Sequence, residues 1–176
     1  MSSARFSPPP LTPPPKITVR PAEPADAETM HEAILQLGRF TGLEAKIAST
    51  VEDFRRFGFG TDAAFSSLIA EVDGEFAGLC LFFPIFSTWL GRPGVYVQDL
   101  YVDERFRGRR IGERLLREVA GWSHQRGGVY LRLAVDVENV SAQGFYERLG
   151  IGWLDSDRDH GAYGEAFLAL ARTTTN

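Results

Sequence analysis

An arginine-rich segment stands out in a chain that is acidic overall. The stretch DERFRGRRIGERLL, residues 103–116, holds five arginines around Gly108 and Gly112, whereas the 176-residue chain has a formal net charge of -4. Guanidinium groups make bidentate hydrogen bonds to phosphate, and glycine lets a ligand approach the backbone. A local anion such as a diphosphate would account for this cluster. The alternative is that the arginines form only a solvated helix face.

The segment lies between an expected strand and an expected helix. Residues 95–102, VYVQDLYV, are rich in β-branched and aromatic residues, which favours a strand. Residues 111–125 predict an amphipathic helix whose apolar face carries Leu115, Leu116, Val119 and Trp122. The first N–H groups of a helix have no internal partner, and the helix dipole attracts anions there. The loop and the helix start are therefore a predicted phosphate site.

The remaining pattern indicates one α/β domain with helices on the faces of a sheet. We expect residues 1–15, which are rich in proline, to be a flexible arm and residues 16–172 to form the domain. Asp73-Gly74 predicts a hairpin between two antiparallel strands. Further strands are expected at 17–20, 129–135 and 165–171, and further helices at 26–40, with Asp26 as N-cap, 50–57 and 141–149.

Composition excludes several classes of function. The single cysteine, Cys80, rules out an internal disulfide, and its apolar neighbours indicate a buried, inert thiol. The negative net charge opposes general nucleic-acid binding. No apolar run approaches the roughly 20 residues of a membrane-spanning helix, and the first residues lack a signal-peptide pattern. We expect a cytoplasmic protein with no nucleic-acid partner, no membrane contact and no metal.

Two segments carry a resemblance to a known family. A P-loop needs GxxxxGK[ST] and a dinucleotide fold needs GxGxxG, and the loop has neither. Instead, RGRRIG resembles the Arg/Gln-x-x-Gly-x-Gly/Ala segment with which the GNAT family of N-acetyltransferases holds the diphosphate of acetyl-CoA. DVENVSAQGFYERLG, residues 136–150, is similar to that family's second cofactor segment. The order of segments over residues 17–171 is similar to the spermidine/spermine branch, which is usually dimeric. The resemblance implies a GNAT fold, a mixed and mostly antiparallel sheet with helices on both faces.

The resemblance also implies roles for single residues. Acetyl-CoA would be the co-substrate, and the strand residues Leu100, Tyr101 and Val102 would bind its pantetheine arm through the backbone. The Leu100 amide would donate to the thioester oxygen as an oxyanion donor. The diphosphate would be held by Arg107, Gly108, Arg109, Arg110, Ile111, Gly112 and Glu113.

In the second cofactor segment, Asn139 and Ser141 would contact the cofactor arm, and Tyr146 would be the general acid that protonates the leaving thiolate. Asn139 and Tyr146 also have simpler interpretations. Asn139 is also a plausible N-cap of the helix that follows, and it could serve both purposes. Tyr146 could be an aromatic side chain that packs under the helix with its hydroxyl satisfied.

This chain departs from the family pattern at three positions. Arg110 replaces a glycine, which would cost roughly 1 to 2 kcal/mol if φ is positive there and little in a right-handed helix start. Gln98 stands where polyamine-acetylating relatives carry a glutamate, and Thr41, after Phe40, replaces a second expected carboxylate. Glutamine can neither accept a proton as a base nor balance a cation. Asp99 is adjacent, but neighbours on a strand face opposite sides, so it should not simply replace that glutamate.

The expected substrate-binding residues are Phe40, Thr41, Gln98 and Asp99, and the loss of two anionic contacts indicates a primary amine less cationic than a polyamine. Proton removal would run through ordered water or through Glu44, Glu32 or Asp155. The leading hypothesis is an acetyl-CoA-dependent N-acetyltransferase that acts on a small-molecule amine in a ternary complex and forms a homodimer. The alternatives are a degenerate CoA-binding regulatory module and a protein amine acetyltransferase.

Overall fold

The computed structural model describes residues 14–154, 160 and 162–171. By its internal contacts the chain divides into two compact units, Met1–Ala134 and Val135–Asn176. The strands of the sheet and the arginine-rich loop belong to the first unit. The single domain expected over residues 16–172 stays a prediction, and most of the expected arm lies outside the described residues.

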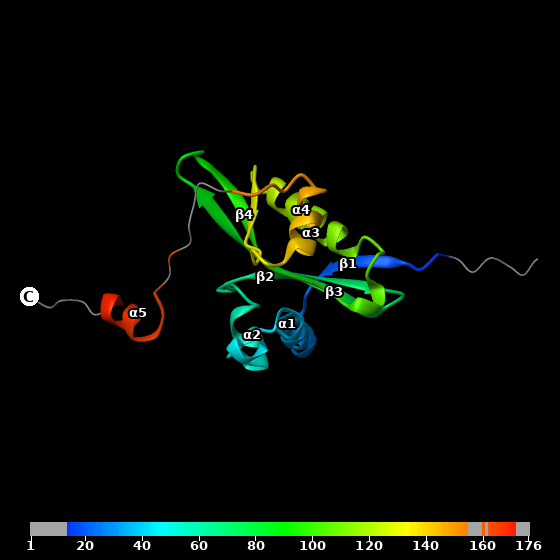
Figure 1. Ribbon diagram of the computed structural model, residues 1–176, viewed down its shortest axis with the longest axis horizontal. Helices are drawn as coiled ribbons and strands as arrows, with labels where there is room; N and C mark the ends of the chain where they lie inside the picture. The colour runs from blue at the N-terminus through cyan, green and yellow to red at the C-terminus, as the bar shows by residue number, and fades with distance from the viewer. Residues whose placement is uncertain (1–13, 155–159, 161, 172–176) are drawn as a thin grey trace, which may run out of the picture. The chain divides into compact units, whose positions relative to one another are not determined.

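The first unit is built on a five-stranded sheet in the order β1-β2-β3-β4-β5 (Figure 1). Neighbouring strands from β1 to β4 are antiparallel, and β5 runs parallel to β4, which confirms the mixed and mostly antiparallel sheet. Asp73 and Gly74 have φ of 52° and 85°, the positive values that a tight two-residue hairpin requires. The strands are β1 Ile17–Pro21, β2 Ser66–Val72, β3 Glu75–Ser87, β4 Arg92–Val102 and β5 Leu131–Leu133.

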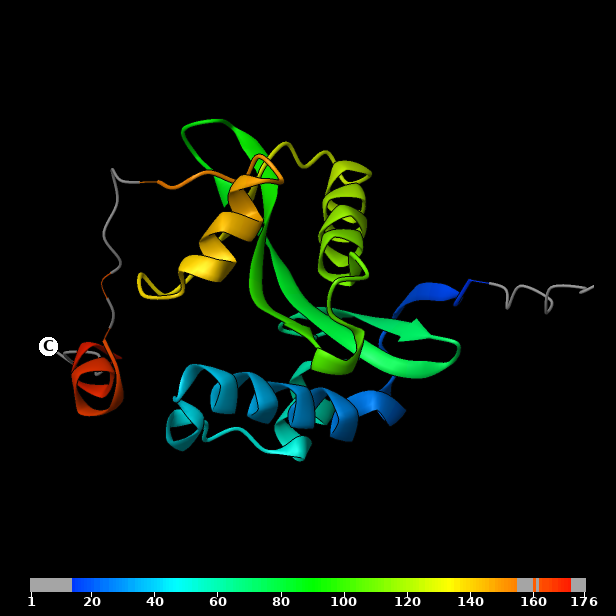
Figure 2. The same ribbon diagram turned by 45° about the vertical axis from the view of Figure 1, so that its right-hand side comes forward.

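Helices cover both faces of this sheet, as Figures 1 and 2 show. On one face, α1 (Ala27–Thr41) and α2 (Val51–Phe57) bury Met30 and Phe54 against Leu79 and its neighbours on the strands. The structure thus confirms the helices expected at 26–40 and 50–57. Asp26 precedes α1 but does not cap it, because its carboxylate binds Arg20 at 2.7 Å.

On the other face, α3 (Ile111–His124) packs through the apolar residues that its sequence pattern predicted. Gly78 of β3 allows this close approach. A Cβ atom there would lie 2.8 Å from the carbonyl oxygen of Tyr101 and 3.3 Å from side-chain atoms of Ile111 and Leu115. Farther along, the ring of Trp122 meets that of Phe82 edge-on at 5.0 Å.

The second unit contains α4 (Val140–Glu147) and α5 (Gly164–Ala171). The strand expected at residues 165–171 is wrong, because this segment is the helix α5. Its sequence EAFLALA consists mainly of strong helix formers, and a short apolar run does not distinguish a strand from a helix by periodicity. The short helix expected near residues 141–149 is confirmed as α4.

Candidate active site

The site begins where β4 and β5 separate. β5 pairs with β4 only along Val95–Val97, so that, among the described residues of the first unit, no strand pairs with the far edge of residues 98–102. The Asp103 N–H donates to the Ala77 carbonyl of β3 at 3.0 Å. Because the carbonyl of one residue and the N–H of the next point oppositely in a trans peptide, the Val102 carbonyl faces this open edge. Backbone N–H and C=O groups of successive residues point to opposite edges of a strand. The backbone groups of Leu100 therefore face the open edge as well, and those of Tyr101 face β3.

A β-bulge interrupts β4 beside this edge. Leu81 of β3 pairs with Asp99, but the next residue, Phe82, pairs with Val97, so Gln98 is an extra residue on β4. Gln98 is exposed, and Asp99 is half-buried. A bulge bends the strand and redirects its side chains. Strict alternation was the reason for expecting that Asp99 does not replace Gln98. That alternation does not hold at the bulge.

Asp99 differs electrostatically from the other acids considered. Burial raises its pKa to about 6, and a proton acceptor works best when its pKa lies close to the working pH. Glu32 and Glu44, expected as alternative bases, both bind Arg39, at 3.1 and 2.8 Å. Asp155 lies outside the described residues. Asp99 is therefore the acid that we consider further as a proton acceptor.

The arginine-rich loop has an unusual backbone. After the short 3-10 helix η3 (Glu104–Phe106), Gly108 has φ of 77° and Arg110 has φ of 60° and ψ of 24°. Arg110 thus adopts the left-handed conformation, the costly one of the two alternatives for this position. Its side chain does not cap α3, so the first N–H groups of the helix face the loop without a side-chain acceptor from its N-cap residue.

The arginines of the loop fall into two groups. Arg105 binds Asp103 at 2.8 Å and also pairs with Glu75, and Arg110 binds Glu113 at 2.8 Å. These side chains have carboxylate partners, although Arg110 shares Glu113 with Arg117. In contrast, two other arginines of the loop have no ion pair with any described residue. Their guanidinium groups lie over aromatic rings instead. They are Arg107, over Phe40, and Arg109, over Phe106.

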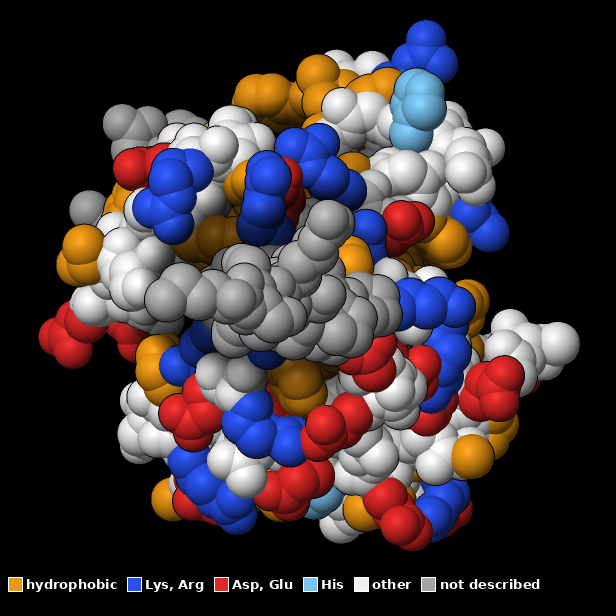
Figure 3. All heavy atoms as spheres, turned by 90° about the vertical axis from the view of Figure 1, so that its right-hand side faces the viewer, with side chains coloured by type: hydrophobic (Ala, Val, Ile, Leu, Met, Phe, Trp, Pro, Cys, Tyr) orange, Lys and Arg blue, Asp and Glu red, His pale blue; other side chains and the backbone are white. Residues whose placement is uncertain are grey.

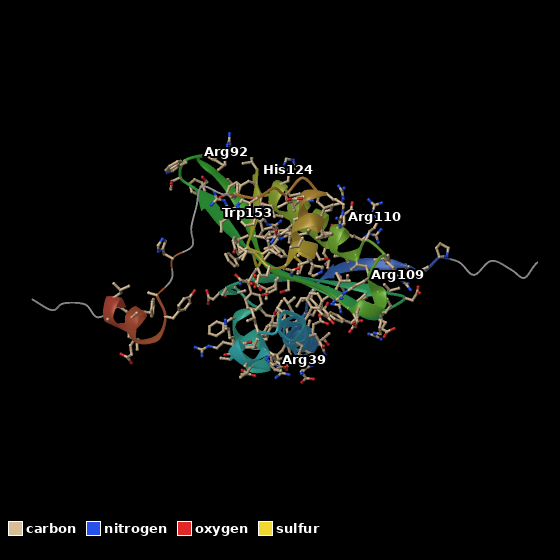
Figure 4. The ribbon with its side chains drawn as sticks, viewed as in Figure 1. Arg39, Arg92, Arg109, Arg110, His124 and Trp153 are labelled. Carbon is tan, nitrogen blue, oxygen red and sulfur yellow. The ribbon has the colours of Figure 1, made fainter. Side chains whose placement is uncertain are left out.

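The side chains of Arg109 and Arg110 project from the start of α3, and Arg39 lies on α1 (Figure 4). The loop therefore offers two cations, Arg107 and Arg109, together with backbone N–H groups to an anion. Binding of a phosphate by this loop stays a prediction.

A groove runs beside α1 and the end of β4. Its floor includes the stacked rings of Phe76 and Tyr101, with centroids 6.3 Å apart. Four carboxylates line it, and three of them are partnered by arginines: Glu28 by Arg55, Glu32 by Arg39 and Asp103 by Arg105. The fourth, Glu104, has no ion pair within the described residues. The lower part of Figure 3, where α1 and α2 lie, shows the same mixture of acidic and basic side chains. Each of these arginines also binds a second carboxylate, namely Glu52, Glu44 or Glu75, so the acids of the groove are only partly balanced.

Three predicted residues belong to the second unit. The Asn139 side chain accepts a hydrogen bond from the Ala142 N–H at 3.1 Å, which confirms its role as N-cap of α4. Ser141 is exposed in the first turn of this helix. Tyr146 is half-buried, with its ring 5.2 Å from that of Phe145. The expected contacts of all three with the cofactor stay predictions.

Sequence analysis missed two features of the site, because both depend on tertiary structure. Neither the bulge at Gln98 nor the contact of Phe40 with Arg107 has a local sequence signal.

In the described part of the chain, no group of three or more His, Cys, Asp or Glu side chains could hold a metal ion. Of the helices described, none is both long and apolar enough to cross a bilayer.

Comparison with known proteins gives concordant matches. The sequence model of the acetyltransferase (GNAT) family matches residues 31–151. The thialysine N-epsilon-acetyltransferase of Mus musculus is 33% identical over 168 residues, which covers 87% of this chain and 96% of that protein.

Solved structures share the fold. An integron cassette protein from the mobile metagenome of V. cholerae superimposes with a TM-score of 0.74 at 17% identity, covering 89% of this chain and 98% of that one. An aminoglycoside N-acetyltransferase in complex with CoA superimposes with a TM-score of 0.62 at 19% identity, over 88% of this chain and 99% of that one.

Proposed function

Since the chain belongs to the acetyltransferase (GNAT) family, we propose that it transfers the acetyl group of acetyl-CoA to a primary amine of a small molecule less cationic than a polyamine. The observation that carries this proposal is the open edge of β4 next to the arginine-rich loop. The edge presents backbone donors and acceptors, and the loop presents cations and helix N–H groups. A pantetheine arm and a diphosphate need these two kinds of partner in this order.

The polar groups of the site fit such a co-substrate. Leu100 and Val102 direct their backbone groups to the open edge, where they would bind the pantetheine arm. Arg107, Arg109 and the first N–H groups of α3 would bind the diphosphate, because a helix start favours anions. Acetyl-CoA supplies an acetyl thioester, whose carbonyl carbon bonds to the amine nitrogen as its bond to sulfur breaks.

The residues of the chain would manage charge and protons. An alkyl ammonium must lose a proton before it can attack, and Asp99, with its pKa raised to about 6, would accept that proton directly or through water. The Leu100 N–H would donate to the developing oxyanion, an interaction whose loss typically costs about 3 to 4 kcal/mol in the barrier. Tyr146 would protonate the leaving thiolate.

The nature of the amine follows from charge. Gln98 and Thr41 are neutral, so two anionic contacts that a polycation would use are absent. A relative aligned over most of this chain is named for thialysine, an amino acid. We therefore propose an amino-acid-like acceptor for this enzyme, and further propose that it works as a cytoplasmic homodimer.

The direct test is thiol release from acetyl-CoA with a panel of amines. We expect turnover with thialysine or lysine, and a lower kcat/KM with spermidine. A higher kcat/KM with spermidine than with every amino acid in the panel would refute the charge assignment. Binding of CoA without turnover of any amine or protein amine would favour a regulatory module.

A further inference from the structure

Phe40 makes a contact that its expected role in amine binding does not explain. It is the second-last residue of α1, and 59% of its surface is exposed. The guanidinium carbon of Arg107 lies 4.8 Å from the centroid of its ring, which is cation–π geometry. Burial in the core therefore does not account for this aromatic side chain, whereas stacking on an arginine does.

The same arginine is also tied to β4. Arg107 Nε donates to the Val102 carbonyl at 3.3 Å, and that carbonyl belongs to the open edge. The guanidinium is thus fixed on one face by the ring of Phe40 and along one side by the strand. An arginine has five N–H donors, and within the described residues no hydrogen bond involves the terminal Nη groups of Arg107, which can bind a phosphate in bidentate fashion.

We propose that Phe40 is a positioning residue for the co-substrate. Its ring holds the Arg107 guanidinium at the open edge of β4, with its free N–H groups ready for the diphosphate, and it thereby sets the affinity for CoA rather than for the amine. Holding a flexible side chain in its binding conformation before the ligand arrives reduces the entropy lost on binding. This inference rests on the proposed function, because it needs CoA to be the ligand.

The test is the substitution Phe40→Leu, which keeps an apolar side chain and removes the ring. We expect the Kd for CoA, measured by titration calorimetry, to rise about two- to fivefold, the size of an exposed cation–π contact. The matched control is Phe57→Leu on α2, where the ring of Phe57 lies 5.0 Å from the guanidinium carbon of Arg56 and is 41% exposed. This control should leave the Kd unchanged.

Two further measurements separate positioning from a general structural effect. In an Arg107→Gln background, Phe40→Leu should cause no additional loss of CoA affinity, because the stacked cation is already gone. With S-acetylpantetheine, which has no diphosphate, kcat/KM should be the same for the wild type and Phe40→Leu.

Several outcomes would overturn the inference. An unchanged Kd for CoA with a raised KM for the amine would place Phe40 in the amine site. A loss of affinity that persists in the Arg107→Gln background would mean that the ring acts through something other than the guanidinium. If the wild type itself binds no CoA, the proposed function fails as well, and that failure is visible before any variant is compared.

Discussion

At the scale of single residues, Asp99 shows how burial prepares a carboxyl for proton transfer. Its raised pKa of about 6 predicts that kcat falls as the pH drops below about 6, since only the ionised form can accept the proton of the amine. Asp99→Asn should lower kcat by about 10²- to 10⁴-fold and remove this limb of the pH–rate profile. Asp62→Asn, at an exposed position, is the control. A wild-type profile without a limb near this pH would contradict the assignment.

The same pKa makes a separate prediction about stability. Because the pKa of Asp99 is raised above the unfolded value of about 3.9, the folded state prefers the protonated form. Its favourable contribution is complete below about pH 4 and is lost as the pH rises through about 6. Asp99→Asn, which is always neutral, should therefore exceed the wild type in unfolding free energy by about 1 kcal/mol at about pH 8, and by less at about pH 4. Denaturant titrations at both pH values measure this, and a difference independent of pH would exclude it.

At the scale of elements, the start of α3 tests the left-handed conformation of Arg110. Arg110 and Arg117 both bind Glu113, but only Arg110 has positive φ. Arg110→Gly should be about 1 kcal/mol more stable than Arg110→Ala. At position 117, inside the helix, Arg117→Ala should instead be more stable than Arg117→Gly by about the same amount. Unfolding free energies of the four variants decide this, and an advantage of alanine at both positions would contradict the backbone conformation.

The packing of α3 on β3 gives a second prediction at this scale. Gly78→Ala would add a methyl group 2.8 Å from the Tyr101 carbonyl oxygen of β4 and 3.3 Å from side-chain atoms of Ile111 and Leu115 of α3, so we expect a loss of about 1 to 3 kcal/mol in unfolding free energy. Gly121→Ala, in α3 and with no atom within 4 Å of the added carbon, should be neutral or stabilising by up to about 1 kcal/mol. Equal effects of the two changes in thermal or denaturant unfolding would exclude the close approach.

At the scale of the whole molecule, the two compact units raise the question of cooperativity. If residues 16–172 are one domain, calorimetry should show a single unfolding transition. CoA at about 100 times its Kd should raise the stability by about 2.7 kcal/mol and the midpoint by about 5 to 10 °C. Two transitions, of which CoA shifts only one, would instead show that the units unfold separately.

The sequence by itself indicated most of the elements and the family. The Asp73-Gly74 turn and the apolar face of α3 are local patterns from which the backbone conformation follows, whereas the RGRRIG loop pointed to the family but left the φ of Arg110 open. The expected C-terminal strand failed where the pattern was an apolar run without clear periodicity, and the structure has α5 there.

Only the tertiary structure decided the properties of the site. The bulge at Gln98 arises from the pairing of β4 with β3, and the raised pKa of Asp99 comes from what packs around it. The contact of Phe40 with Arg107 joins residues far apart in the chain. Burial, strand register and long-range contacts depend on how distant segments pack together, and no short stretch of sequence encodes that packing.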